Sequence, residues 1–175
     1  MYLELFSWKM NKILYIPSVT TIPSKHPLKG EARAFFKQNC LPEHFVKKNA
    51  KTKVINSCLN PVWNEEMVFS IKEPVGIIKF EVFDRDRFKS DDKMGHAFLD
   101  LQPLAAATKL RRALKLTTGE TKLRKVAPSA DNCLLSDSFV TYADGEIVLD
   151  SRLRLRDVES GELFVTVKWT EADAK

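Results

Sequence analysis

The chain of 175 residues is 44% hydrophobic, which is enough for one domain with a hydrophobic core of its own. Its 28 Lys and Arg against 23 Asp and Glu give a net charge of +5, which favours an anionic partner such as lipid, nucleic acid or acidic protein. Three scattered cysteines and no long apolar run argue against a disulfide framework, a structural zinc site and a transmembrane helix, and they favour a reducing compartment.

The first candidate strands are short. Residues 12–16 and 18–22 are rich in β-branched and aromatic side chains, and their prolines suit the edge of a sheet. A further strand is predicted over residues 47–55, where the two-residue period places Lys51 and Lys53 on the same face. Two neighbouring ammonium groups form a candidate binding site for an anionic lipid headgroup.

A turn and two strands come next. Asn60-Pro61 predicts a turn, and Trp63 just after it is a large aromatic side chain to bury. Strands are predicted over residues 67–71 and 77–83, the second with alternating apolar and charged residues.

An acidic loop follows the second of these strands. Asp84, Asp86 and Asp92 are candidate ligands for Ca²⁺, a hard cation that takes about six to eight oxygen ligands. Arg87, Phe88 and Lys89 lie between them and are expected to point outward, toward a lipid headgroup layer. The alternative is an ordinary solvated turn, since acidic loops commonly bind nothing. Met94-Gly95 and a returning strand over 97–101 favour the calcium site, because they hold the loop at both ends.

A helix is predicted over residues 103–114, with Pro near its first turn and an Ala-rich body. It opens a basic group that contains a single acid, Glu120. This group either holds the domain on an anionic bilayer, at about 1 kcal/mol per residue, or forms a solvated face. Its members are Lys109, Arg111, Arg112, Lys115, Lys122, Arg124 and Lys125.

The C-terminal part is predicted to be β-sheet. Strands are expected over 139–142, 146–149, 152–156 and 163–169, and Asp144-Gly145 is a hairpin signal because it tolerates positive φ. Many short strands with one helix between them predict an all-β fold, an antiparallel β-sandwich with one short helix.

No enzyme site can be assembled from the sequence. His26, His44 and His96 accompany no nucleophile elbow, zinc-protease helix or P-loop, so we predict that the chain is not an enzyme. Cys40 and His44 have helical spacing, yet they lack a second pair of metal ligands. A nucleic-acid-binding basic β domain is an alternative, in which Phe88, Trp63 and Tyr142 stack on bases, although Trp63 fits a core position better.

The motifs quoted above resemble a C2 domain. The resemblance rests on Lys51 to Asn56, on Asn60-Pro61-Val62-Trp63-Asn64-Glu65 and on the segment from Phe83 to Gly95. Segments 132–134, 144–145 and 153–162 are similar to the signature insertion of the plant C2-domain abscisic-acid-related (CAR) proteins. The C2 half of plant ARF GTPase-activating proteins is also similar. The resemblance covers about residues 49 to 169 and implies an eight-stranded C2-type sandwich with the insertion at about 104–160.

The N-terminal region departs from the family pattern. C2 domains begin with two strands and a first calcium loop that contains aspartates, whereas residues 1–46 contain no Asp and only Glu4, Glu31 and Glu43 as acids, in no suitable spacing. We therefore expect a divergent leader over 1–46 and the C2 domain over 47–170, with the first two strands divergent or missing. Segments 12–16 and 18–22 are the candidates to replace them, and Ca²⁺ binding should be weak or lost.

The resemblance implies a peripheral module at an anionic phospholipid membrane, with Asp84, Asp86 and Asp92 as metal ligands. Lys51, Lys53, Arg87, Phe88 and Lys89 are the expected lipid-binding residues. An abscisic acid receptor or a GTPase is implied as protein partner, and no nucleic acid is expected. The expected locations are the cytoplasmic face of the plasma membrane, the cytoplasm and the nucleus. A calcium-independent protein–protein scaffold is the other alternative.

Overall fold

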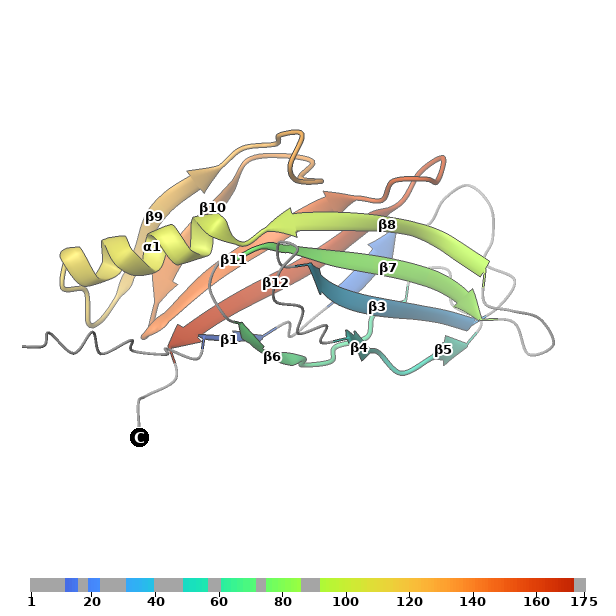
Figure 1. The fold of residues 1–175 in the computed structure, drawn as a ribbon, viewed down its shortest axis with the longest axis horizontal. Coiled ribbons are helices and arrows are strands. Elements are labelled where there is room, and N and C mark those ends of the chain that lie inside the picture. Colours follow the sequence, from blue (N-terminus) through green and yellow to red (C-terminus); the bar gives the residue numbers. More distant parts are fainter. Residues whose placement is uncertain are drawn as a thin grey trace, which may run out of the picture.

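Figure 1 shows the fold in a computed structural model, which describes residues 12–15, 19–22, 31–39, 49–56, 61–71, 75–85 and 92–171. Within these residues there are twelve strands and one helix. The strands are β1 (Lys12–Tyr15), β2 (Val19–Ile22), β3 (Glu31–Asn39), β4 (Asn49–Lys51), β5 (Ile55–Asn56), β6 (Val68–Ile71), β7 (Ile77–Arg85), β8 (Asp92–Asp100), β9 (Glu120–Val126), β10 (Ser138–Ala143), β11 (Glu146–Arg154) and β12 (Glu162–Glu171), and the helix is α1 (Gln102–Ala113).

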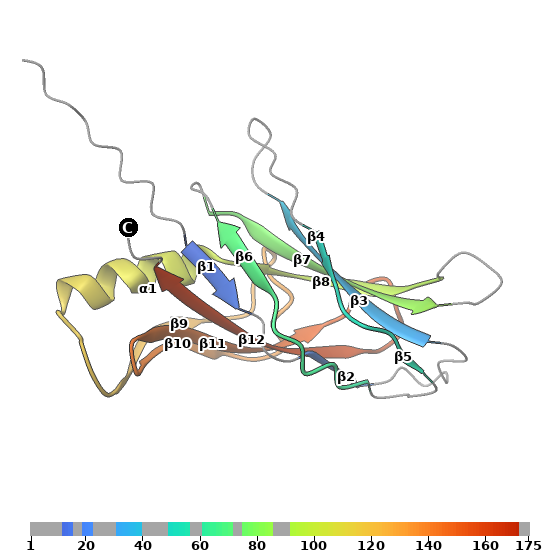
Figure 2. The ribbon, with the colours of Figure 1, turned by 90° about the horizontal axis from the view of Figure 1, so that it is seen from below.

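The strands form two antiparallel sheets, which Figure 2 shows as two layers. The seven-stranded sheet has the order β6-β1-β12-β11-β10-β9, with β2 also paired to β12. The five-stranded sheet has the order β4-β3-β7-β8, with β5 also paired to β3. The all-β sandwich predicted from the sequence is confirmed.

The described residues form more strands than the eight expected, because two strands are interrupted and the insertion contains strands of its own. β1 and β2 both pair with β12, and β4 and β5 both pair with β3, so each pair forms one interrupted strand. Counted in this way there are ten strands, of which β9, β10 and β11 lie in the expected insertion at 104–160. β1, β2 and β3 lie in the region that departs from the family pattern, and this region contributes strands to both sheets.

The local sequence pattern does not predict β3 and β9, and it predicts the single strand β11 as two strands. β3 pairs with β7 over nine residues, although its own residues show no strand signal that we recognise. β9 lies in the basic group, where alternation is hidden by exposure on both faces. β11 runs unbroken through residues 150–151, which the sequence pattern places between two strands.

The segments proposed to replace the first two strands do join a sheet. Segment 12–15 lies between β6 and β12, and segment 19–22 pairs further along β12. Both sheets thus extend across residue 46, where we place the end of the leader. That domain boundary remains a prediction.

The core lies between the sheets and is built by alternation. In β11 the buried residues are Ile147, Leu149, Ser151 and Leu153, with more exposed neighbours between them. Trp63, Trp169, Tyr142 and Phe80 are the largest side chains that are almost fully buried. Trp63 and Trp169 are both 1% exposed, as expected for core positions.

Helix α1 begins one residue before its predicted start and ends one residue before its predicted end. Pro103 lies in its first turn, and Oδ1 of Asp100 accepts a hydrogen bond from the backbone N–H of Gln102 at 2.9 Å. Leu104, Ala105, Ala107 and Thr108 are buried, so one face of the helix packs on the domain. No helix in the described part of the chain is long and apolar enough to cross a membrane.

The free edge of β8 is covered by chain from the other half of the molecule. His96 donates a backbone hydrogen bond to Arg156 O at 3.1 Å, and the Arg156 N–H donates to His96 O at 2.7 Å. The Cys133 N–H donates to Phe98 O at 2.9 Å, and the Phe98 N–H donates to Cys133 Sγ at 3.3 Å. These bonds tie the five-stranded sheet to the chain that flanks β11.

Gly95 permits this close approach. The sequence pattern places it at the end of the acidic loop, but it lies inside β8, opposite Val82. A Cβ at this position would lie 2.8 Å from Cγ1 of Val158 and 3.0 Å from the carbonyl oxygen of Arg156, and the φ of Gly95 is +139°. Only glycine combines this φ with so little space.

We predict that Gly95→Ala destabilises the domain more than Gly145→Ala does. Gly145 has a φ of +96° but nothing within 4 Å of an added Cβ, so its substitution should cost only the backbone strain, about 1–2 kcal/mol. Gly95→Ala adds overpacking of about 1–3 kcal/mol. Urea unfolding of both variants measures the difference, and equal losses would contradict the steric explanation.

Candidate functional site

The β7–β8 hairpin carries the predicted calcium ligands at its loop end. Asp84 of β7 and Asp92 of β8 are direct register partners, so their main chains lie about 5 Å apart. Asp86 lies outside the described residues, as do the side chains of Asp84 and Asp92. The structure therefore brings two of the three predicted positions together but leaves their role as ligands a prediction.

A bulge lies beside this loop. Val82 pairs with Gly95 and Phe83 with Lys93, so Met94 is an extra residue in β8. Bulges bend a hairpin and increase its twist, and they are common next to functional loops. Such a bend changes the direction of the loop end of the hairpin relative to the rest of the sheet.

A third carboxylate position lies at the same end of the sheet. Glu31 is the first residue of β3 and pairs with Arg85, next to Ala32, which pairs with Asp84. No local sequence signal associates Glu31 with the loop, because more than fifty residues separate them. Only the pairing of β3 with β7 reveals it. Among the described side chains, no group of three His, Cys, Asp or Glu is placed to hold a metal ion.

The predicted lipid-binding lysines lie along one edge of the five-stranded sheet. Lys51 ends β4, the edge strand, and Lys53 follows it; both are exposed, while Thr52 between them is 5% exposed. The alternation predicted for these residues is confirmed, although residues 52–54 are not in a strand. We call Lys51 and Lys53 the lysine edge. Arg87, Phe88 and Lys89 of the loop tip lie outside the described residues.

The Asn-Pro-x-Trp-Asn-Glu motif supports this lysine edge. Trp63 is buried in the core, and Asn64 takes a φ of 45°, a conformation that Asn tolerates well. The next residue, Glu65, accepts a hydrogen bond from the Lys53 N–H at 2.9 Å, and the same oxygen lies 3.9 Å from Lys53 Nζ. The motif thus fixes the backbone at Lys53 to a tryptophan anchored in the core.

The second basic group is assembled by packing of α1 against β9. Lys109, Arg111 and Arg112 lie on α1, Lys115 follows it, and Lys122, Arg124 and Lys125 lie on β9. The guanidinium of Arg111 lies 5.0 Å from the centre of the Tyr142 ring, and Lys122 Nζ lies 4.7 Å from that of Phe139. We call these seven residues, with the helix and strand that hold them, the α1–β9 surface.

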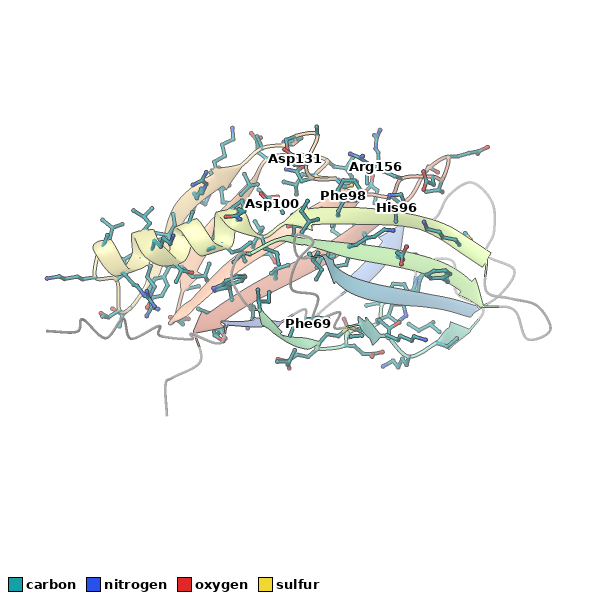
Figure 3. The ribbon with its side chains drawn as sticks, in the orientation of Figure 1. Phe69, His96, Phe98, Asp100, Asp131 and Arg156 are labelled. Atoms are coloured by element: carbon teal, nitrogen blue, oxygen red, sulfur yellow. The ribbon has the colours of Figure 1, made fainter. Side chains whose placement is uncertain are left out.

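His96 lies in a cluster between β8 and the chain after β11, as Figure 3 shows. The guanidinium of Arg156 lies 4.4 Å from the centre of the Phe98 ring, and the His96 and Phe98 ring centres are 5.7 Å apart. His96 Nδ1 lies 2.9 Å from Oδ2 of Asp157, without the alignment of a hydrogen bond. Burial lowers the pKa of His96 below 6.5, against the opposing attraction of Asp157. This histidine joins two chain segments.

The aromatic side chains do not favour the nucleic-acid alternative. Trp63 and Tyr142 are two of the candidates to stack on bases, but they are 1% and 0% exposed. Base stacking needs an accessible ring face. The third candidate, Phe88, and the possible metal pair Cys40 and His44 lie outside the described residues.

A family model of the C2 domain matches residues 16–116. The chain belongs to the C2 domain family. The match begins well before residue 47 and includes β2 and β3. It also includes the hairpin of Asp84 and Asp92, so these positions lie within the C2 part of the chain.

Comparison with individual C2 proteins confirms the resemblance stated above. The chain is 54% identical over 121 residues to the protein C2-DOMAIN ABA-RELATED 11 of Arabidopsis thaliana, covering 69% of this chain and 73% of that protein. It is 38% identical over 125 residues to GTPase activating protein 1 of Oryza sativa subsp. japonica, covering 71% and 74%. Among solved structures, the first C2 domain of plant Extended Synaptotagmin 1 matches with a TM-score of 0.54 and 20% identity, covering 95% of this chain and 98% of that domain.

We predict that His96 makes the domain less stable in mild acid. Because its pKa is lower in the folded state, the unfolded chain takes up the proton first, and the free energy of unfolding falls as the pH drops below about 6.5. His96→Asn should remove this contribution. Urea unfolding of both proteins from pH 7.5 to 5 tests it. A difference in stability that does not change with pH would show that folding leaves the pKa of His96 unchanged.

Proposed function

We propose that this C2 domain is a non-enzymatic peripheral module that binds anionic phospholipid through the lysine edge and the tip of the 84–92 loop. The observation that carries the proposal is the pair of exposed lysines at a sheet edge, Lys51 and Lys53, with the backbone of Lys53 fixed by Glu65. A fixed backbone lowers the entropy lost when the two ammonium groups engage a headgroup layer.

The loop tip supplies the second part of the proposed contact. Phe88 between Arg87 and Lys89 suits shallow insertion, with the ring below the headgroups and the two cations among them. Burial of one Phe is worth about 1.5–3 kcal/mol, comparable with two or three lysine contacts at about 1 kcal/mol each. Both parts should therefore contribute to binding.

We predict that Lys51→Glu/Lys53→Glu weakens binding to phosphatidylserine-containing liposomes by about thirtyfold or more, because two lysine contacts are replaced by repulsion. Co-sedimentation measures the loss. Arg152→Glu/Arg154→Glu is the control for net charge, since both arginines are exposed on β11 of the other sheet; because Arg152 is ion-paired with Glu162, urea unfolding first confirms that this variant is folded. An equal loss in both variants would mean that only net charge matters, and an unchanged affinity in the first would exclude the lysine edge.

Calcium is a weak second ligand in this proposal. The adjacent positions of Asp84 and Asp92, which share one face of the sheet, support a site with carboxylate oxygens. Such a site supplies fewer charged oxygens than one with an aspartate-containing first loop, since residues 1–46 contain no Asp. The ion would neutralise the loop and allow it to approach anionic lipid.

We predict that calcium strengthens liposome binding only modestly, and that Asp84→Asn/Asp92→Asn abolishes this increase while binding in chelator is kept or improved. Glu31→Gln is the control and should leave the increase unchanged, because the register places Glu31 on the opposite face of the sheet from Asp84. Co-sedimentation with calcium and with chelator measures each effect. A calcium response that persists in Asp84→Asn/Asp92→Asn would place the ion elsewhere.

The proposed protein partner is an abscisic acid receptor or a GTPase that the module brings to the membrane. The names of the Arabidopsis and rice relatives support these two possibilities. The cytoplasmic face of the plasma membrane, the cytoplasm and the nucleus are the proposed locations. Fluorescent fusions of the wild type and of Lys51→Glu/Lys53→Glu test whether plasma-membrane localisation depends on the lysine edge.

A further inference from the structure

The positive charge of the protein is concentrated in one segment. Residues 102–126 contain seven Lys and Arg and one acid, Glu120, which gives them a net charge of +6. The remaining 21 basic and 22 acidic residues nearly cancel. The long-range attraction of the protein for anions therefore originates in the α1–β9 surface and not in the lysine edge.

The fold separates this surface from the proposed lipid contact. In Figure 1, α1 and β9 lie at the opposite end of the molecule from the C-terminal end of β7 and the start of β8. The lysine edge follows β4, whereas α1 continues from β8, and these two strands are the opposite edges of the five-stranded sheet. One flat bilayer that touches the loop and β4 therefore faces away from the α1–β9 surface.

Apolar side chains accompany these charges. Leu110 of α1 and Leu114 at its C-cap are 39% and 54% exposed, and their spacing of four residues places them on one side of the helix. Exposed leucines beside basic residues are typical of helices that lie in the interface of an anionic bilayer. Nucleic-acid binding is less favoured, because neither nearby ring offers a free face for base stacking: Tyr142 is buried, and Lys122 lies over the Phe139 ring.

We propose that the α1–β9 surface binds a second anionic bilayer, so that one domain holds two membranes together. This inference rests on the proposed function, because the lysine edge and loop must occupy the first membrane. The basic residues of α1 and β9 contact headgroups of the second membrane, and Leu110 and Leu114 enter its interface. The domain then spans the gap between two vesicles.

The test is clustering of phosphatidylserine-containing vesicles, followed by light scattering, beside co-sedimentation of the same vesicles. Wild type should raise the scattering. Lys109→Glu/Arg124→Glu reverses two exposed charges of the α1–β9 surface and should abolish clustering while most co-sedimentation is retained. Arg152→Glu/Arg154→Glu, with the same change in net charge, should cluster vesicles like the wild type. Urea unfolding confirms that each variant is folded.

The lysine-edge variant separates the two proposals. Lys51→Glu/Lys53→Glu should bind one bilayer through the α1–β9 surface alone, about thirtyfold more weakly than the wild type, and should not cluster vesicles. Unchanged clustering in this variant would exclude the lysine edge but not the α1–β9 surface. Combination of all four substitutions should lower co-sedimentation by more than about a hundredfold, since about four lysine-type contacts are lost.

Three results would overturn the bridging inference. One is clustering by Lys109→Glu/Arg124→Glu equal to that of the wild type. Another is complete loss of its co-sedimentation, which would mean that both surfaces contact one bilayer. The last is a wild-type dimer, seen by sedimentation equilibrium without vesicles, that these substitutions dissociate. An oligonucleotide that blocks clustering at far lower concentration than soluble headgroup would instead assign the surface to nucleic acid.

Discussion

The edge of β8 is the constraint on which the rest of the fold depends. A nine-residue strand with a free edge would leave a row of backbone groups available for pairing with another chain. Here two alternate residues of β8 form hydrogen bonds along this edge with both their N–H and C=O groups. His96 pairs with Arg156, and Phe98 pairs with Cys133. The approach at Arg156 is possible because Gly95 has no side chain. The two sheets are thereby joined by backbone hydrogen bonds as well as by the apolar core.

This junction also determines where the charged surfaces lie. The chain passes from β8 directly into α1, and α1 packs against β9. The lysine edge at β4 stays at the far side of the same sheet, held by Trp63 and Glu65. The two basic surfaces of this small domain consequently face in different directions. The order of charged residues along the chain does not reveal this arrangement.

Local patterns predicted much of the fold, and long-range pairing accounts for what was missed. Alternation identified β6, β7, β10 and β12, and Pro103 with the Ala-rich stretch identified α1, because these signals lie within a few residues. β9 carries no such signal, since it is exposed on both faces, and β3 is recognisable chiefly by its nine pairs with β7. The same limit applies to the site: the side-by-side exposure of Lys51 and Lys53 is local, whereas the position of Glu31 near Asp84 depends on strand pairing.

The exposed side of β9 has a consequence for self-association. As the last strand of the seven-stranded sheet, β9 has backbone groups that are not paired with another strand in the described part of the chain. Lys122, Arg124 and Lys125 line this strand, so two copies that approach edge to edge repel one another. The same charges that attract an anionic surface thus oppose edge-to-edge association of two copies, and concentrated salt weakens this repulsion by screening them.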